Sequence, residues 1–198
     1  MKFSSLKMEQ NHCIKKMKSA VQTAVHPPPP DPDLFQETSV MALFIFNQVL
    51  ELVFIQKADV EGYPWRNQMA FPGGHVEKMD FTSQEAALRE LQEEMGIQAE
   101  NVGIIGSLGH FQTINNKDIE AFIGIWNQKE IITHDTSEIS RVFKIPFAYL
   151  TKLHREKGYS GCRPNVMKLT YPYEDVVIWG VTAKILHHLI EVLIPAKM

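Results

Sequence analysis

The chain has 198 residues, of which 44% are hydrophobic, so it is long enough to bury the core of one ordinary globular domain. Its formal net charge of -3 excludes an overall basic field that would gather nucleic acid or an anionic membrane, so we expect neither as a partner. Cys13 and Cys162 lie in no CxxC pair and at no metal-ligand spacing with histidine, which predicts reduced thiols in a cytoplasmic protein.

The first 33 residues differ in composition from the rest of the chain. Apolar residues recur at roughly helical spacing from Leu6 to Val21, which predicts a short amphipathic surface helix. Its lysines and few acids leave an organelle presequence as a weaker alternative. The following run HPPPPDPD lacks backbone donors and favours an extended, stiff connector. We therefore expect a helix and linker over residues 1–33 and one domain over residues 34–198.

The remainder of the chain alternates between strand and helix patterns. Apolar runs at 40–46 and 50–56 predict a hairpin, and 102–111 and 119–126 predict two strands joined by a turn. Between these pairs, Thr82 or Ser83 as N-cap and Gly96 as terminator predict a helix from Gln84 to Met95. Further along we expect a strand at 142–145, a helix opened by Pro146, a strand pair within VMKLTY and DVVIW, and a last helix from near Trp179 to Pro195. Strands on both sides of a helix in the chain predict an α/β fold with a sheet between helices.

Three glutamates cluster on one face of the predicted helix at 84–95. Glu90, Glu93 and Glu94 stand at i, i+3 and i+4, so their carboxylates share one face, while leucines and a methionine take the opposite one. Such clustered charges repel one another unless a cation offsets them, and hard oxygen ligands suit Mg²⁺ or Mn²⁺. Arg89 reaches Glu93 at i+4, so it can orient that carboxylate.

The segment FPGG ahead of this helix supplies a complementary loop. Paired glycines at Gly73 and Gly74 let the backbone approach a ligand closely, and a main-chain carbonyl there can act as an oxygen ligand. Tyr63 and Trp65, earlier in the same loop, either stack on a base or cap the core. The loop and the helix together predict a cradle for a metal ion and phosphate.

The ordered combination of these residues resembles the signature of the Nudix family. Residues 89–97 match its second half, Arg-Glu-apolar-x-Glu-Glu-x-Gly-apolar, without a gap. The first half departs, because Asp80 stands where the family has Glu, and eight residues separate it from Arg89 where the family has seven. This departure, MAFPGG, SEISRVFKIPFAYL and VVIWGVTAKIL look like the branch that cleaves coenzyme A. The resemblance covers about residues 40–190.

The resemblance implies a Nudix fold, a mixed sheet between helices, and hydrolysis of a diphosphate by a metal-activated water. Carried over by position, Mg²⁺ or Mn²⁺ is held by the Gly74 carbonyl, Glu90, Glu93 and Glu94, with Arg89 orienting them. The general base is one of these glutamates or Glu120, since some members of the family take it from a later loop or strand. The residues expected to contact a small nucleotide substrate are Trp65, Arg66, Phe71, Gly73 and Gly74.

Several alternatives stay open at this point. Tyr63 and Asn67 stand where the coenzyme A branch usually has Arg and Gly, so ADP-ribose, NADH and dinucleoside polyphosphates remain candidate substrates beside coenzyme A. A Nudix-fold ligand sensor is a second hypothesis, although sensors typically lose the glutamates that this chain keeps. A third hypothesis is that the N-terminal helix and the proline run recruit a partner or a membrane surface. Family members often form homodimers, but no feature of the sequence demands one.

Three further pairs of residues carry weaker signals. His110 and Phe111 either line a pocket or are packed, and His187 and His188 are interpreted as structural. Arg163 and Lys168 are candidates for pairing with a substrate phosphate.

Overall fold

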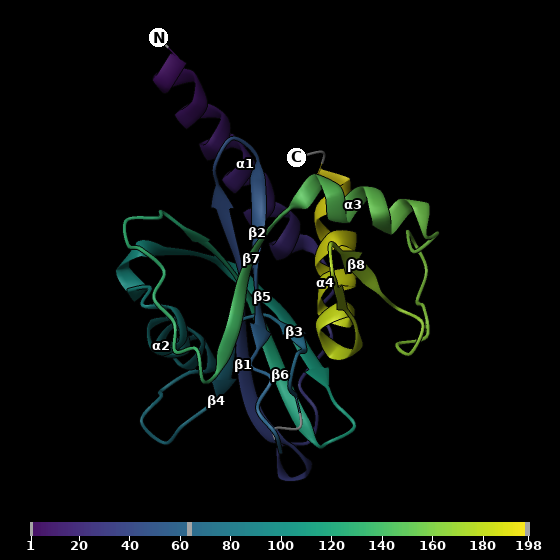
Figure 1. The fold of residues 1–198 in the computed structure, drawn as a ribbon. Coiled ribbons are helices and arrows are strands. Elements are labelled where there is room, and N and C mark those ends of the chain that lie inside the picture. The colour runs from purple at the N-terminus through teal and green to yellow at the C-terminus, as the bar shows by residue number, and fades with distance from the viewer. Residues whose placement is uncertain (1, 63–64, 197–198) are drawn as a thin grey trace.

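A computed structural model describes the backbone of residues 2–62 and 65–196 and the side chains of residues 8–62 and 65–195 (Figure 1). Its four α-helices are α1 (Lys2–Thr23), α2 (Ser83–Met95), α3 (Phe147–Glu156) and α4 (Gly180–Leu193) within those ranges. The strands there are β1 (Gln36–Phe46), β2 (Leu50–Lys57), β3 (Met69–Ala70), β4 (Gly73–His75), β5 (Val102–Gln112), β6 (Lys117–Trp126), β7 (Ile139–Pro146), β8 (Tyr171–Tyr173) and β9 (Val176–Ile178). Short 3-10 turns occupy Pro32–Leu34, Ala99–Asn101 and Ile194–Ala196.

The main sheet is mixed. Its central path runs β3-β2-β1-β6-β5, with β4 also pairing with β1 and β7 with β2. β1 and β6 are parallel over ten residue pairs from Gln36↔Lys117 to Ile45↔Trp126, and the other pairs are antiparallel. The β1–β2 and β5–β6 hairpins confirm the two strand pairs predicted from apolar runs. Strands β8 and β9 form a separate two-stranded sheet.

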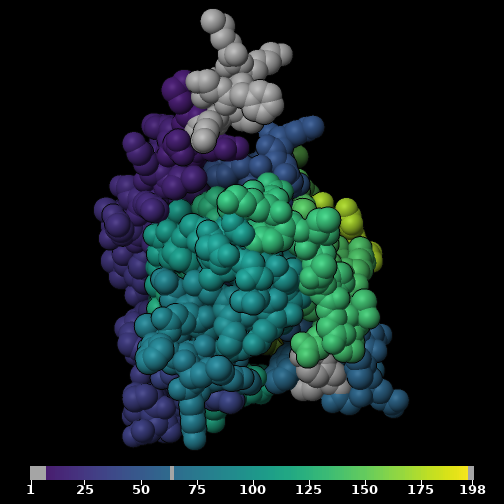
Figure 2. All heavy atoms as spheres, turned by 90° about the vertical axis from the view of Figure 1, so that its left-hand side faces the viewer, coloured from purple at the N-terminus to yellow at the C-terminus, as the bar shows by residue number. Residues whose placement is uncertain are grey.

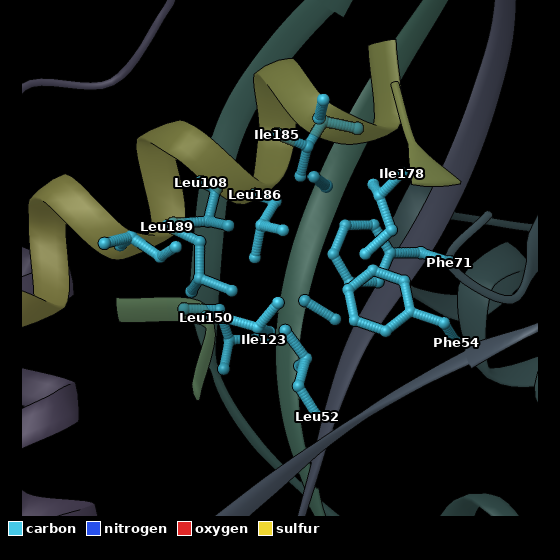
Figure 3. Close-up of a cluster of buried hydrophobic side chains, with 14 of the residues drawn as sticks. Leu52, Phe54, Phe71, Leu108, Ile123, Leu150, Ile178, Ile185, Leu186 and Leu189 are labelled. Carbon is cyan, nitrogen blue, oxygen red and sulfur yellow. The ribbon is translucent and has the colours of Figure 1, made fainter. Parts of the chain in front are cut away.

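Both faces of the sheet are covered by helices, which confirms the predicted α/β class. Side chains alternate along β1, so Ala42 and Phe44 join one core while Met41 and Leu43 join the other. The first core lies under α4, and Figure 3 shows the leucines and isoleucines of α4 packed on side chains from the sheet. The second core lies between the sheet and α2. This second layer fixes which face of α2 is left for chemistry.

The N-terminal helix is longer and more buried than the sequence predicted. Met17 is 0% exposed and Val21 is almost as buried, and both belong to the core under α4.

The proline run lies along the edge strand β5, where the Pro27 carbonyl accepts from His110 N at 3.0 Å. Figure 2 shows this purple N-terminal segment running down one side of the molecule. An edge strand has unpaired backbone groups, which this segment covers. The domain boundary at residue 34 stays a prediction.

Two smaller elements differ from the sequence prediction. Residues 166–168 of VMKLTY form a turn, with Lys168 N bonded to Asn165 O at 2.9 Å, and the strand begins only at Tyr171. The predicted pairing partner DVVIW does form β9. Pro146 lies at the N-cap of α3 and not at its first turn, because β7 extends to it. The first boundary was displaced by a turn and the second by the extension of β7 to Pro146, and both depend on the surrounding fold.

Within the described part of the chain, no helix is both long enough and apolar enough to cross a bilayer.

Candidate functional site

Helix α2 is placed by strong local signals at both ends. The Thr82 hydroxyl accepts from Glu85 N at 3.1 Å, and Gly96 closes the helix in the left-handed region with φ of 69°. Leu91 and Met95 are fully buried against the sheet. This confirms the predicted helix and its apolar face, and it turns Glu90 and Glu94 toward β4.

Glu94 is a buried carboxylate held by two partners. Its side chain is only about 5% exposed, Oε1 accepts from Lys57 Nζ at 2.6 Å, and Oε2 accepts from Gly73 N at 2.9 Å. A buried charge is tolerated only when paired and hydrogen-bonded, and both conditions hold here. The contacts tie α2 to the end of β2 and to the start of β4.

Arg89 connects the acidic groups around α2. Its guanidinium donates to both oxygens of Asp80 at 3.1 and 3.0 Å, and its Nη1 donates to Glu90 at 3.0 Å and to Glu93 at 2.8 Å. Nη2 also donates to the His75 carbonyl at 2.9 Å. These hydrogen bonds lower the pKa of Asp80 and raise the pKa of Arg89. The aspartate that departs from the family pattern therefore still meets the arginine, through a bidentate pair.

The stability of this pair gives a testable prediction. Asp80→Asn is expected to lower the free energy of unfolding by about 1.5–3 kcal/mol, the usual contribution of a hydrogen bond to a charged group. Because the native pKa of Asp80 is depressed, its stabilisation is present above the ordinary pKa of aspartate and is lost as pH falls through the native value. Urea unfolding at pH 7 and pH 3 measures this, and the deficit should shrink at pH 3. Asp175→Asn, which removes an exposed ion pair with Arg141, is the matched control with a smaller effect. An equal deficit at both pH values would contradict the assignment.

Glu90 lies against the glycine pair. Burial is the largest influence on its carboxyl and raises its pKa, while Arg89 opposes that rise. A Cβ placed on Gly74 would lie 2.6 Å from Glu90 Oε2, so glycine there leaves room for the carboxylate. At Gly73 a Cβ would lie 2.6 Å from the Val40 Cα, and φ is 148°, which favours glycine. Each glycine is thus required for a different reason.

A cavity of about 380 Å³, here called the main cavity, brings part of the predicted site together. Glu90, Glu94, Gly73 and Gly74 all line it. Glu93 does not, because its side chain is 59% exposed and bound to Arg89. Two carboxylates beside a glycine backbone are a donor set that fits Mg²⁺ or Mn²⁺. In the described part of the chain, however, no three acidic, histidine or cysteine groups converge as a ready-made metal site, so Glu93 would have to leave Arg89 to join.

The predicted substrate contacts divide into those near the main cavity and those away from it. Trp65 lines the cavity, and Phe71 lines it from the core, where it stacks on Phe54 with ring centroids 4.6 Å apart. Arg66 is not part of the lining; its side chain is mostly exposed and lies 3.8 Å from Asp59. The prediction for Tyr63 falls outside the described residues.

Glu120 does not line the main cavity. Its neighbours Ile119 and Lys117 line that cavity, and because strand side chains alternate, Glu120 points toward the α2 layer. There it accepts from Ser83 Oγ, and from Ser107 Oγ at 2.8 Å. This candidate base therefore lines a different cavity from Glu90 and Glu94 and contacts the first residue of α2.

A neighbouring cavity of about 320 Å³, lined by Glu120, His110 and Asp118, lies under the proline run. His110 Nδ1 is 2.7 Å from Asp118 in this cavity, whereas Phe111 is buried in the core. His188 Nε2 lies 3.0 Å from His26 Nδ1 in a packed contact. Arg163 and Lys168 are exposed and line neither of these two cavities.

Two lysines of the main cavity were missed by sequence reasoning. Lys57 ends β2 and Lys117 begins β6, and both line the cavity. A lysine at a strand end is usually a solvated surface residue, so the local sequence did not indicate that either lysine lines a cavity. Only the pairing of β6 with β1 and of β2 with β3 brings them beside the glycine pair.

Comparisons with known proteins bear on the family and the fold of the chain. The sequence model of the family described as NUDIX domain matches residues 36–166. Two curated relatives, both named as uncharacterised Nudix hydrolase NudL, are 31% identical in Pectobacterium atrosepticum and 34% identical in Salmonella paratyphi B, over 62% of this chain. The chain spans only 65% of the length of each. A crystal structure of a MutT/nudix family protein from Enterococcus faecalis superposes with TM-score 0.53 at 16% identity, covering 91% of this chain and 78% of the other, which shows a shared fold.

Proposed function

The chain belongs to the Nudix family, and from that premise we propose that it hydrolyses the diphosphate linkage of a nucleoside diphosphate derivative with the help of a divalent cation. The observation that carries this proposal is the placement of Glu90 and Glu94 on one cavity wall, beside a glycine backbone that a Cβ would block. The three signature glutamates, Glu90, Glu93 and Glu94, are all present, which favours hydrolysis over the alternative of a ligand sensor.

Mg²⁺ or Mn²⁺ would be held by Glu90 and Glu94, joined by Glu93 and the Gly74 carbonyl. When bound, such an ion lowers the pKa of a coordinated water and neutralises charge on phosphoryl oxygens. Arg89 holds Glu90 and Glu93 in place through hydrogen bonds of 3.0 and 2.8 Å. A glutamate of this cluster accepts the proton of the attacking water. Glu120 is outside the main cavity, so we assign it to anchoring the start of α2 through Ser83.

Within the family, we propose coenzyme A as the first substrate to test, cut to 3′,5′-ADP and 4′-phosphopantetheine. Asn67 stands where the coenzyme A branch usually has glycine, and its backbone adopts φ of 60°. Glycine favours this left-handed region and asparagine tolerates it, so the loop backbone accommodates the exchange. This compatibility supports the coenzyme A branch. Tyr63, which replaces the arginine usual in that branch, gives it no support.

The test is a substrate panel. Purified protein with Mg²⁺ or Mn²⁺ is incubated with coenzyme A, ADP-ribose, NADH and a dinucleoside polyphosphate, and products are separated by chromatography. We expect cleavage between the two phosphates, fastest for coenzyme A. Cleavage of another compound with coenzyme A spared would overturn the branch assignment alone. No cleavage of any compound would overturn the proposed function.

A further inference from the structure

Lys117 is a cation in the main cavity that forms no ion pair with a carboxylate of the described residues. Its Nζ lies 4.4 Å from the centroid of the Trp65 ring and 3.3 Å from His75 Nε2. Lys57, the other lysine of this cavity, is by contrast compensated by Glu94. Among the residues that the structure describes, no acidic side chain therefore pairs with the partly buried positive charge of Lys117.

Three separate elements hold this ammonium in position. Lys117 comes from the start of β6, His75 from β4 and Trp65 from the loop before β3. An ammonium only donates hydrogen bonds, so His75 Nε2 accepts from Lys117, which leaves Nδ1 to donate to Thr38 Oγ1 at 3.4 Å. The indole face attracts the cation through its quadrupole. The contacts fix a long, flexible side chain at the cavity wall, and fixing it costs conformational entropy.

The chemistry around Lys117 suits an anion with phosphate character. Thr113 and Asn115, from the connection between β5 and β6, line the same cavity and offer neutral polar groups. Ile119 and Ile185 line the apolar part. A partly desolvated ammonium binds phosphate oxygens more strongly than an exposed one, because water competes less.

We propose that Lys117 contacts a phosphate group of the nucleotide substrate, with Trp65 and His75 as its positioning residues, and thereby favours phosphorylated ligands over neutral ones. This inference rests on the proposed function for the identity of the ligand. The anion-binding property itself is independent of hydrolysis. It belongs to the chain's own residues and requires no metal ion.

The first arm of the test measures anion binding in metal-free protein. Inorganic pyrophosphate is titrated by calorimetry into wild type, Lys117→Gln and Lys117→Arg. Losing one charged hydrogen bond weakens binding about tenfold, so Lys117→Gln should raise Kd by that factor and Lys117→Arg should retain most of the affinity. Lys152→Gln, which alters an exposed lysine of α3, is the charge-matched control and should leave Kd unchanged. Equal Kd values for wild type and Lys117→Gln would overturn the inference.

The second arm separates binding from structural effects. Because Lys117 lacks a carboxylate partner, Lys117→Gln should not lower Tm, and a clear drop in Tm would instead show a structural role. Trp65→Leu should also raise the Kd of pyrophosphate, and its effect should not add to that of Lys117→Gln, because both remove one contact. Additive effects would overturn the positioning role.

The third arm uses whichever substrate the panel finds to be cleaved. Lys117→Gln should raise KM with little change in kcat, and a fall in kcat at constant KM would contradict a binding role. If no substrate is cleaved while pyrophosphate affinity still depends on Lys117, the proposed function fails and the anion site stands. If cleavage proceeds but affinity is independent of Lys117, only the inference fails.

Discussion

Glu90→Gln is expected to lower kcat for diphosphate hydrolysis by about 10²- to 10⁴-fold, the range typical of a lost acid–base group. The amide has nearly the same shape, and its oxygen can still accept from Arg89, so the fold should persist. What changes is the charge on the wall of the main cavity, where Glu90 lies against Gly74. The measurement is steady-state kinetics with Mg²⁺ on the best substrate of the panel, together with Tm.

Glu85→Gln is the matched control for this variant. Glu85 lies in the first turn of the same helix, is exposed and accepts from Phe81 N at 2.9 Å. Its kcat should equal that of wild type. Turnover by Glu90→Gln at the wild-type rate, with equal Tm, would remove Glu90 from the catalytic machinery.

The largest effect on stability is expected from removing residues 1–33. This deletion exposes the core under α4, where Met17 and Val21 are buried, and leaves edge strand β5 without its covering segment. Burial of each such side chain contributes about 1.5–3 kcal/mol, so the truncated chain should unfold several kcal/mol more easily or fail to fold. Chemical denaturation of the full and truncated chains measures the difference.

A pair of point variants makes the same test without truncation. Met17→Ala should cost about 2–5 kcal/mol, because it leaves a cavity at a fully buried position. Met8→Ala, on the same helix at a side chain 65% exposed, should change stability by less than about 0.5 kcal/mol. Equal stabilities for the two variants would show that α1 does not contribute to the core.

The sequence predicts well those parts of the site that depend on residues close together in the chain. The cap at Thr82, the terminator Gly96 and the spacing of the three glutamates all act within one helix, so α2 and its acidic face followed from periodicity alone. The requirement for glycine at Gly73 and Gly74 was predicted from their lack of a Cβ, and the structure gives the contacts responsible.

The parts that sequence predicts poorly depend on contacts between distant segments. The sequence predicts that Glu120 is a strand residue near a turn. The face of the sheet toward which its side chain points depends on the register of β6 against β1. The positions of Lys57 and Lys117 in the main cavity have the same origin, because separate strands bring them together. Met17 looked like part of a surface helix, since a modest apolar stripe does not reveal which layer of the fold will cover it.

The central claim is that the wall formed by Glu90, Glu94 and Gly74 holds a divalent cation against a diphosphate. Its most direct test is a crystal structure of the protein with Mn²⁺, using anomalous scattering to locate the ion. We expect a peak within bonding distance of the Glu90 and Glu94 carboxylates, with Lys57 displaced from the oxygen of Glu94 that binds the ion. An anomalous map without a peak there, with Lys57 still bound to Glu94 at a saturating Mn²⁺ concentration, would contradict the account.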